Sequence, residues 1–167
     1  MTPGIRSHFD QALAQLGEQM MDLGSRARQG VELGVRAFVD NDTNLAQQVI
    51  DADKPINDLR YRVEQQCYEL LAMEQPVAVD LRTIVAALVV ANEFERIGDH
   101  GKKIARIALR TTADPRPIPF SGILRMAEMV LTMLDRTLAA LAGRDVAEAR
   151  ASCLVDDQID AHSKQLF

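Results

Sequence analysis

Aromatic residues are scarce in this sequence. They make up 4% of the 167 residues and tryptophan is absent, whereas the hydrophobic content is 47%. Most of that content is Ala, Leu, Val, Ile and Met, which suits helices packed side by side, while aromatic residues are enriched in strands. The composition therefore predicts an all-α protein built from long antiparallel helices.

Cysteine is almost as rare, with two residues in the chain, Cys67 and Cys153. They are far apart in sequence and form neither a CxxC motif nor a cluster with histidine. This arrangement gives no support to a thiolate zinc site or a disulfide framework. We interpret both as small core residues of a protein in a reducing compartment.

The sequence also lacks a block of basic residues. Its 24 acidic and 19 basic side chains give a formal net charge of −5 and are spread along the chain. Binding to a nucleic-acid backbone needs concentrated positive charge. Nucleic acid is therefore excluded as an expected partner.

Long apolar runs are missing as well. The longest, residues 84–91, is far shorter than the roughly 20 residues that span a bilayer. The first residues lack the apolar segment of a signal peptide. We expect a cytoplasmic protein whose contact with a membrane is peripheral.

What is present is a helical repeat of apolar residues every three or four positions. The segment at residues 77–111 is apolar nearly all round from residue 81 to residue 91. This pattern predicts that the third helix is the buried member of a bundle. Pro55 interrupts the second segment, so a kink or a restart near Asp53 is an alternative there. The segments are residues 9–39, 43–73, 77–111, 121–142 and 145–167.

Three prolines at alternate positions within residues 113–119 predict an extended linker between two units. A shift of 103 positions superposes the break near Asp42 on the break near Asp145, with five identities. We therefore expect a first three-helix repeat at residues 1–112, a linker at 113–120, and a partial second repeat of two helices at 121–167. The chain is expected to stop before the third helix of that repeat.

Two carboxylates one helical turn apart mark the most informative segment, residues 92–104. Glu95 and Asp99 fall on one face of the third helix together with Lys102. Like charges at this spacing repel unless a cation lies beside them, and carboxylates suit iron, manganese, magnesium or calcium. The alternative is a solvated face in which Asp99 pairs with Lys103.

A related pair, Asp53 and Asn57, lies on the second helix, and the repeat places Asp156 and Asp160 at the equivalent positions. One acidic pair from each of two neighbouring helices could assemble a metal site on the bundle surface. The alternative for Asp53 is that it only caps a helix restarting at Pro55.

Motifs of catalysis are absent from the sequence. It contains no glycine-rich phosphate loop, no GxSxG motif, and no Glu-x-x-His motif of di-iron bundles. No residue is therefore expected to act as a nucleophile or a general base.

Residues 95–100 read Glu-Arg-Ile-Gly-Asp-His, with Glu93 two positions before them, and resemble the signature of the PhoU family. The Asp-x-x-Ile pattern of that family stands at residues 53–56 and again at 156–159. The resemblance covers the whole chain and implies tandem, spectrin-like three-helix bundles, of which the second is incomplete here.

The resemblance further implies a negative regulator of the phosphate-starvation response. Such a protein links the ATPase subunit of a phosphate ABC transporter to a membrane sensor histidine kinase. It also implies iron, zinc, manganese or magnesium at surface carboxylates and no organic cofactor. The ligands carried over are Glu95, Asp99, Asp53, Asn57, Asp156 and Asp160.

Two residues depart from the family pattern: Lys103 replaces the usual Asn, and Asn57 replaces an acid. Apolar surface left open on the last two helices predicts a homo-oligomer. Two alternatives to a regulator remain from the sequence, a carboxylate-bridged metal enzyme of helical-bundle type and a metal-free helical interaction module.

Overall fold

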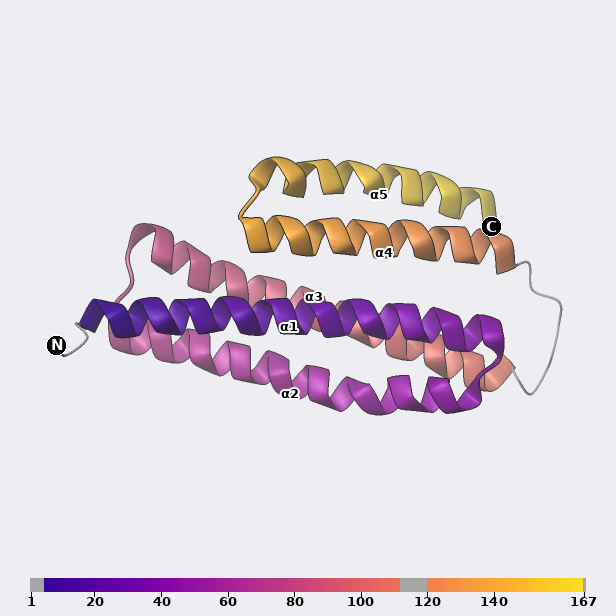
Figure 1. Ribbon diagram of the computed structural model, residues 1–167, viewed down its shortest axis with the longest axis horizontal. Helices are drawn as coiled ribbons and strands as arrows, with labels where there is room; N and C mark the ends of the chain where they lie inside the picture. The colour runs from indigo at the N-terminus through magenta and orange to yellow at the C-terminus, as the bar shows by residue number, and fades with distance from the viewer. Residues whose placement is uncertain (1–4, 112–119, 167) are drawn as a thin grey trace.

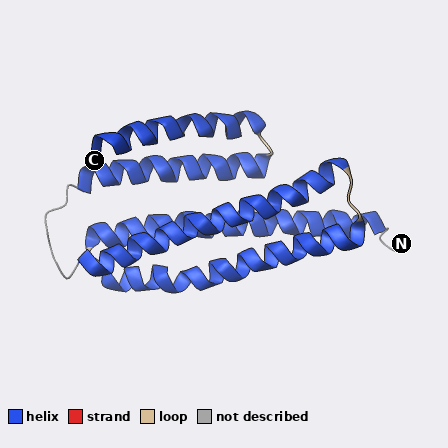
Figure 2. Ribbon diagram, turned by 180° about the vertical axis from the view of Figure 1, so that it is seen from behind, coloured by secondary structure: helices blue, strands red, loops and turns tan. Residues whose placement is uncertain are grey.

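The computed structural model describes residues 5–111 and 120–166, which form five helices and contain no strand (Figures 1 and 2). The expected all-α class is confirmed, and the expected helix boundaries are within a few residues of those observed. The linker expected at residues 113–120 lies almost wholly outside the described residues. The helices are α1 (Ile5–Asp40), α2 (Thr43–Glu74), α3 (Ala78–Thr111), α4 (Phe120–Gly143) and α5 (Val146–Leu166).

Helices α1, α2 and α3 form an antiparallel three-helix bundle, and α4 and α5 form a hairpin beside it (Figure 1). Within the described residues the hairpin joins the bundle through contacts of α4 with α1, and α5 contacts α4 alone. The main core holds fully or nearly fully buried side chains from all three bundle helices. Among them are Leu16, Leu23, Ala27, Ile56, Val63, Cys67, Ile84 and Phe94.

The breaks after α1 and after α4 have the same local structure. Asn41 and Arg144 adopt a left-handed conformation with φ of 51° in both cases. The next residues, Asp42 and Asp145, then cap the following helix, because each Oδ1 accepts a hydrogen bond from the backbone N–H three positions on. These four residues are related by the shift of 103 positions seen in the sequence, so the repeat extends to the geometry of the turn.

Helix α2 runs through Pro55 without a restart. The interpretation of Asp53 as a helix cap is therefore wrong. Asp53 lies in the middle of α2 with 9% of its surface exposed. Asp53 faces α3. It is one of two buried polar or charged residues in the described part of the chain.

Helix α3 is less buried than its composition predicts. Its first half is apolar nearly all round, yet Leu81, Val85 and Val89 are 40%, 46% and 58% exposed. The reason is that only α1 and α2 cover α3 along this stretch, so a helix in a three-helix bundle keeps an outer face. An exposed apolar stripe on α3 is therefore a feature of the surface.

Helices α1 and α3 approach closely where glycines meet. A Cβ placed on Gly101 would lie 2.4 Å from the carbonyl carbon of Gly30, and one on Gly34 would lie 2.6 Å from the carbonyl oxygen of Gly101. These contacts are with backbone, which cannot rotate aside. Glycine is required for the two helices to cross at this distance.

Among the described residues, the contacts that hold the α4–α5 hairpin to α1 include a buried apolar contact and an ion pair. Leu138 is 8% exposed and lies against Gly24, where a Cβ would be 2.4 Å from its Cδ2. Arg28 donates from Nε to Asp135 Oδ1 at 2.6 Å. No helix in the described part of the chain is long and apolar enough to cross a membrane.

Candidate functional site

Four of the six residues predicted as metal ligands lie along the seam between α2 and α3. Asp53 and Asn57 lie on α2, while Glu95 and Asp99 lie one turn apart on α3. Asn92 and Lys102 of α3 contact α2, and Glu95 and Asp99 lie between them on the same face of α3, so this face is turned toward the seam. Asp53 is buried, and the other three are partly exposed.

Lys102 occupies the centre of this group. Its ammonium Nζ lies 2.5 Å from Asp53 Oδ2 and 3.4 Å from Asp99 Oδ1. Its side chain is 20% exposed, against 12% for Asp53 and 36% for Asp99. A lysine from α3 therefore bridges a carboxylate on each helix, and Asp99 pairs with Lys102 rather than with Lys103 as the alternative interpretation of the sequence had it.

The hydrogen bonds around Asp53 favour the charged pair. Asn57 donates from Nδ2 to Asp53 Oδ2 at 3.0 Å and also to the Asp53 carbonyl oxygen. The hydrogen bond to the Asp53 carboxylate raises the pKa of Lys102 above its ordinary value, with Coulombic contributions from both aspartates and against the effect of burial. Lys102 is thus a full cation at neutral pH.

This donor set does not suit a divalent metal ion. A metal needs the lone pairs of the carboxylate oxygens, but Asp53 Oδ2 already accepts from an ammonium and an amide. Asn57 turns its NH₂ group toward Asp53, so the amide donates there instead of offering its carbonyl oxygen. The structure does not otherwise test metal binding at Glu95, Asp99, Asp53 and Asn57, which stays a prediction.

The expected second-repeat pair, Asp156 and Asp160, is exposed on α5, which contacts only α4 among the described helices. These two residues are far from the α2–α3 seam in sequence and on a separate hairpin (Figure 1). No group of three His, Cys, Asp or Glu residues in the described part of the chain is arranged to hold a metal ion. Metal binding at this pair also stays a prediction.

The same seam continues into a polar network that the sequence analysis missed. Arg60 donates from Nη1 to Glu64 Oε2 at 2.8 Å and to Asn92 Oδ1 of α3 at 3.3 Å. Tyr68 donates its hydroxyl to Glu64 Oε1 at 2.8 Å. The signal was available, since residues 53, 57, 60 and 64 step along one face of α2 by four, three and four positions.

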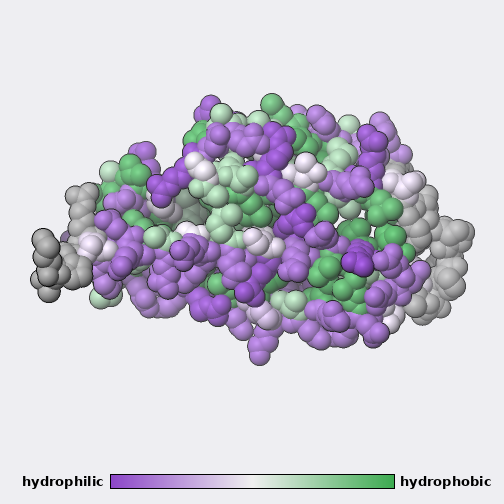
Figure 3. Space-filling model, viewed as in Figure 1, coloured by the Kyte–Doolittle hydropathy of each residue, from purple (hydrophilic) through white to green (hydrophobic). Residues whose placement is uncertain are grey.

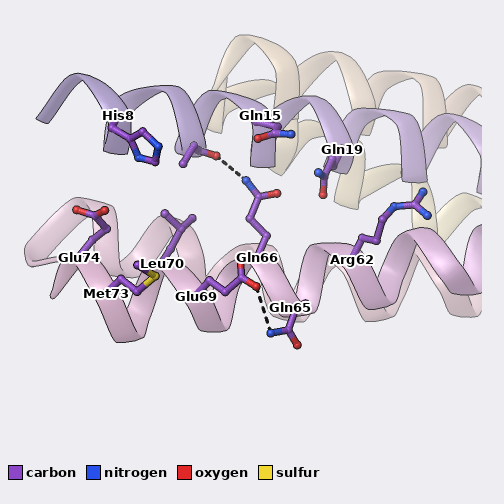
Figure 4. A pocket seen from close by; sticks show the side chains of 11 residues that line it. His8, Gln15, Gln19, Arg62, Gln65, Gln66, Glu69, Leu70, Met73 and Glu74 are labelled. Atoms are coloured by element: carbon purple, nitrogen blue, oxygen red, sulfur yellow. Dashed lines mark hydrogen bonds between the residues drawn. The ribbon is translucent and has the colours of Figure 1, made fainter. Parts of the chain in front are cut away.

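A separate pocket lies between the start of α1 and the end of α2, with a volume of about 430 Å³. Figure 4 shows His8, Gln15 and Gln19 of α1 opposite Arg62, Gln66 and Glu69 of α2, among other lining residues. Gln66 donates from Nε2 to the carbonyl oxygen of Ala12 at 2.9 Å and ties the two helices together. Four of the eleven residues that line the pocket are glutamines, and the others include both charged and apolar side chains.

The outer face of the bundle carries apolar side chains as well as charge. Tyr61 and Tyr68 of α2 are 60% and 50% exposed, in addition to the stripe on α3. Figure 3 shows another face, where apolar patches over the α4–α5 hairpin stand among hydrophilic side chains. The fold and the seam define a class of all-helical bundle proteins with ion pairs along a helix interface and apolar side chains on the surface.

Comparison with known proteins places the chain within that class. The profile of the PhoU domain matches residues 20–108 and 123–167. A relative in Rhizobium meliloti (strain 1021), a phosphate-specific transport system accessory protein PhoU homolog, is 34% identical over 98% of this chain and 69% of its own length. The phosphate-specific transport system accessory protein PhoU of Escherichia coli (strain K12) is 29% identical over 98% of this chain and 69% of its own length.

Solved structures agree with the sequences. The crystal structure of PhoU from Pseudomonas aeruginosa matches with a TM-score of 0.91 and 29% identity, over 95% of this chain and 76% of that one. The phosphate transport system regulatory protein PhoU from Streptococcus pneumoniae matches with a TM-score of 0.88 and 26% identity, over 95% and 74%. The chain belongs to the PhoU family.

Proposed function

We propose that this protein is a non-enzymatic accessory of a phosphate transport system and a negative regulator of the phosphate-starvation response. The observation that carries the proposal is its membership of the PhoU family over nearly the whole chain, since the relatives are described as accessory or regulatory proteins of phosphate transport. The absence of catalytic motifs from the sequence agrees with a role in regulation.

The proposed partners are the ATPase subunit of a phosphate ABC transporter and a membrane sensor histidine kinase, which the protein would connect as an adaptor in the cytoplasm. Support comes from the exposed apolar side chains on the outer face of α2 and α3, including Tyr61, Tyr68 and Val85. Apolar and aromatic side chains gathered on one surface are typical of protein contact sites. Charged side chains beside them, such as Arg60 and Glu64, would set the orientation of a partner.

The regulatory role is tested by expressing the chain in a bacterium whose own PhoU-type protein is deleted. A reporter of the phosphate-starvation response is then measured in high phosphate. We expect the reporter to be repressed by the wild-type chain. A reporter that stays fully active, although the protein accumulates to normal levels, would contradict the proposal.

The partner surface is tested in the same cells by co-purification of the transporter ATPase and the sensor kinase. Val85→Glu places a charge on the outer face of α3 and should reduce both recovery and repression. Leu154→Glu is the matched control, because Leu154 is 68% exposed on α5, away from the α2–α3 surface. Equal loss in both variants would argue against a specific surface on α2 and α3.

The metal-free interaction module is the second function that an observation favours, because Lys102 supplies a cation within the seam. Nothing in the proposed regulatory role requires a metal step. The sequence-based expectations of a homo-oligomer and of peripheral membrane association remain predictions, which light scattering and membrane fractionation would check.

A further inference from the structure

The seam between α2 and α3 contains a position of high negative charge density at which the chain places its own cation. Asp53 and Asp99 come from different helices and different parts of the chain, yet a single ammonium group lies within hydrogen-bonding reach of both, at 2.5 Å and 3.4 Å. Glu95 is one turn from Asp99 on the same face of α3. Without a cation, these carboxylates would repel one another across the seam.

Burial makes that cation necessary. Asp53 is 9% exposed, and an ionised carboxylate held in such a place is costly unless it is paired and hydrogen-bonded. Lys102 and Asn57 supply the pairing and the hydrogen bonds. The negative charge of Asp53 is therefore compensated by side chains of the same protein.

Lys103 shows why the position of the lysine matters. The next residue along the chain has the same side chain but is exposed, and it stands about 100° further round the helix. It cannot reach the seam at the same time as Lys102. The two adjacent lysines therefore provide an internal comparison between a cation inside the acidic group and one outside it.

We propose that Lys102 is the resident cation of the Asp53–Asp99 group and closes it to divalent metal ions, so that α2 and α3 are joined at this point without metal. The ammonium group occupies the space between the carboxylates that an ion would need. It also adds a positive charge that would repel any ion approaching them.

The test measures Mn²⁺ binding by calorimetry and by the electron paramagnetic resonance signal of the free ion. All variants carry Asp156→Asn and Asp160→Asn, so that carboxylates of α5 do not contribute. Lys102→Met keeps the length of the apolar stem and removes the charge, and Lys103→Met is the matched control. Circular dichroism establishes that each variant is folded.

We expect the background protein and Lys103→Met to bind Mn²⁺ weakly and equally. Lys102→Met should bind it at least about tenfold more tightly, because the competing charge is gone and both carboxylates are free. Addition of Mn²⁺ should also raise the melting temperature of Lys102→Met more than that of Lys103→Met, since the ion then compensates buried Asp53. Asp53→Asn in the Lys102→Met protein should abolish both gains.

Two results would overturn the proposal. One is tight Mn²⁺ binding by the background protein that Asp53→Asn removes, because the group would then accept metal with Lys102 present. The other is a folded Lys102→Met protein whose Mn²⁺ affinity is unchanged. Neither result depends on the role in phosphate regulation, so the two proposals can fail separately.

Discussion

Replacing Gly101 by alanine is expected to destabilise the bundle, although alanine is the better helix former. The new Cβ would lie 2.4 Å from the carbonyl carbon of Gly30, 2.6 Å from its oxygen and 2.7 Å from the backbone nitrogen of Val31. All three atoms belong to the backbone of α1. The clash can therefore be relieved only by moving α1 and α3 apart.

The size of the effect follows from two opposing contributions. Alanine in place of glycine within a helix is worth about 1 kcal/mol. Overpacking a core typically costs about 1–3 kcal/mol, and a clash with rigid backbone should reach the upper end of that range. We expect a net loss of about 2 kcal/mol in the free energy of unfolding, which lowers the melting temperature by roughly 4–8 °C for a domain of this size.

Gly17→Ala is the matched control, since it makes the same chemical change in α1. No heavy atom lies within 4 Å of a Cβ at Gly17, so only the gain in helix propensity remains and stability should rise by about 0.5–1 kcal/mol. Thermal and urea unfolding followed by circular dichroism measure both variants. If Gly101→Ala is as stable as the wild-type protein or more stable, the close crossing of α1 and α3 is refuted.

Three further changes test other parts of the fold. Leu138→Ala removes a buried side chain through which α4 packs on α1. Amide hydrogen exchange should therefore accelerate in residues 120–166 and not in α2. Equal acceleration in both segments would count against a separately attached hairpin. The hydrogen bond from Arg136 holds the pKa of Glu148 below its ordinary value near 4.5. The stabilisation from this pair is therefore complete above pH 4.5, and it is lost as the pH falls through the lower pKa that Glu148 has in the folded protein. Glu148→Gln should thus flatten the acid limb of the stability curve, and an unchanged limb would exclude the pairing. Cys67 is buried as expected, whereas Cys153 is exposed, so the interpretation of Cys153 as a core residue is wrong. Because burial raises the pKa of the Cys67 thiol to about 11, a thiol reagent at pH 8 should modify Cys153 in the folded protein and reach Cys67 only on unfolding.

The sequence alone predicted the five helices with boundaries within a few residues of those observed, because the signals are local. The three- and four-residue spacing of apolar positions lies within each helix, and Asp42 and Asp145 cap their helices through backbone groups three residues away. The repeat and the signature at residues 95–100 are likewise properties of the linear chain. These signals were enough to place the chain in its fold class and to indicate its family.

The tertiary structure alone decided how the acidic residues are compensated. Asp53 and Lys102 are 49 positions apart, and their contact depends on the register of α2 against α3, which no local pattern fixes. The sequence placed Lys102 on the right face of α3 but gave no measure of its distance from Asp53, and Pro55 left a helix cap as an alternative to a surface metal ligand for Asp53. Pro55 did not break α2, and the glycine contacts between α1 and α3 set how closely the third helix packs. Packing between distant segments therefore determined that Lys102 contacts Asp53 across the seam.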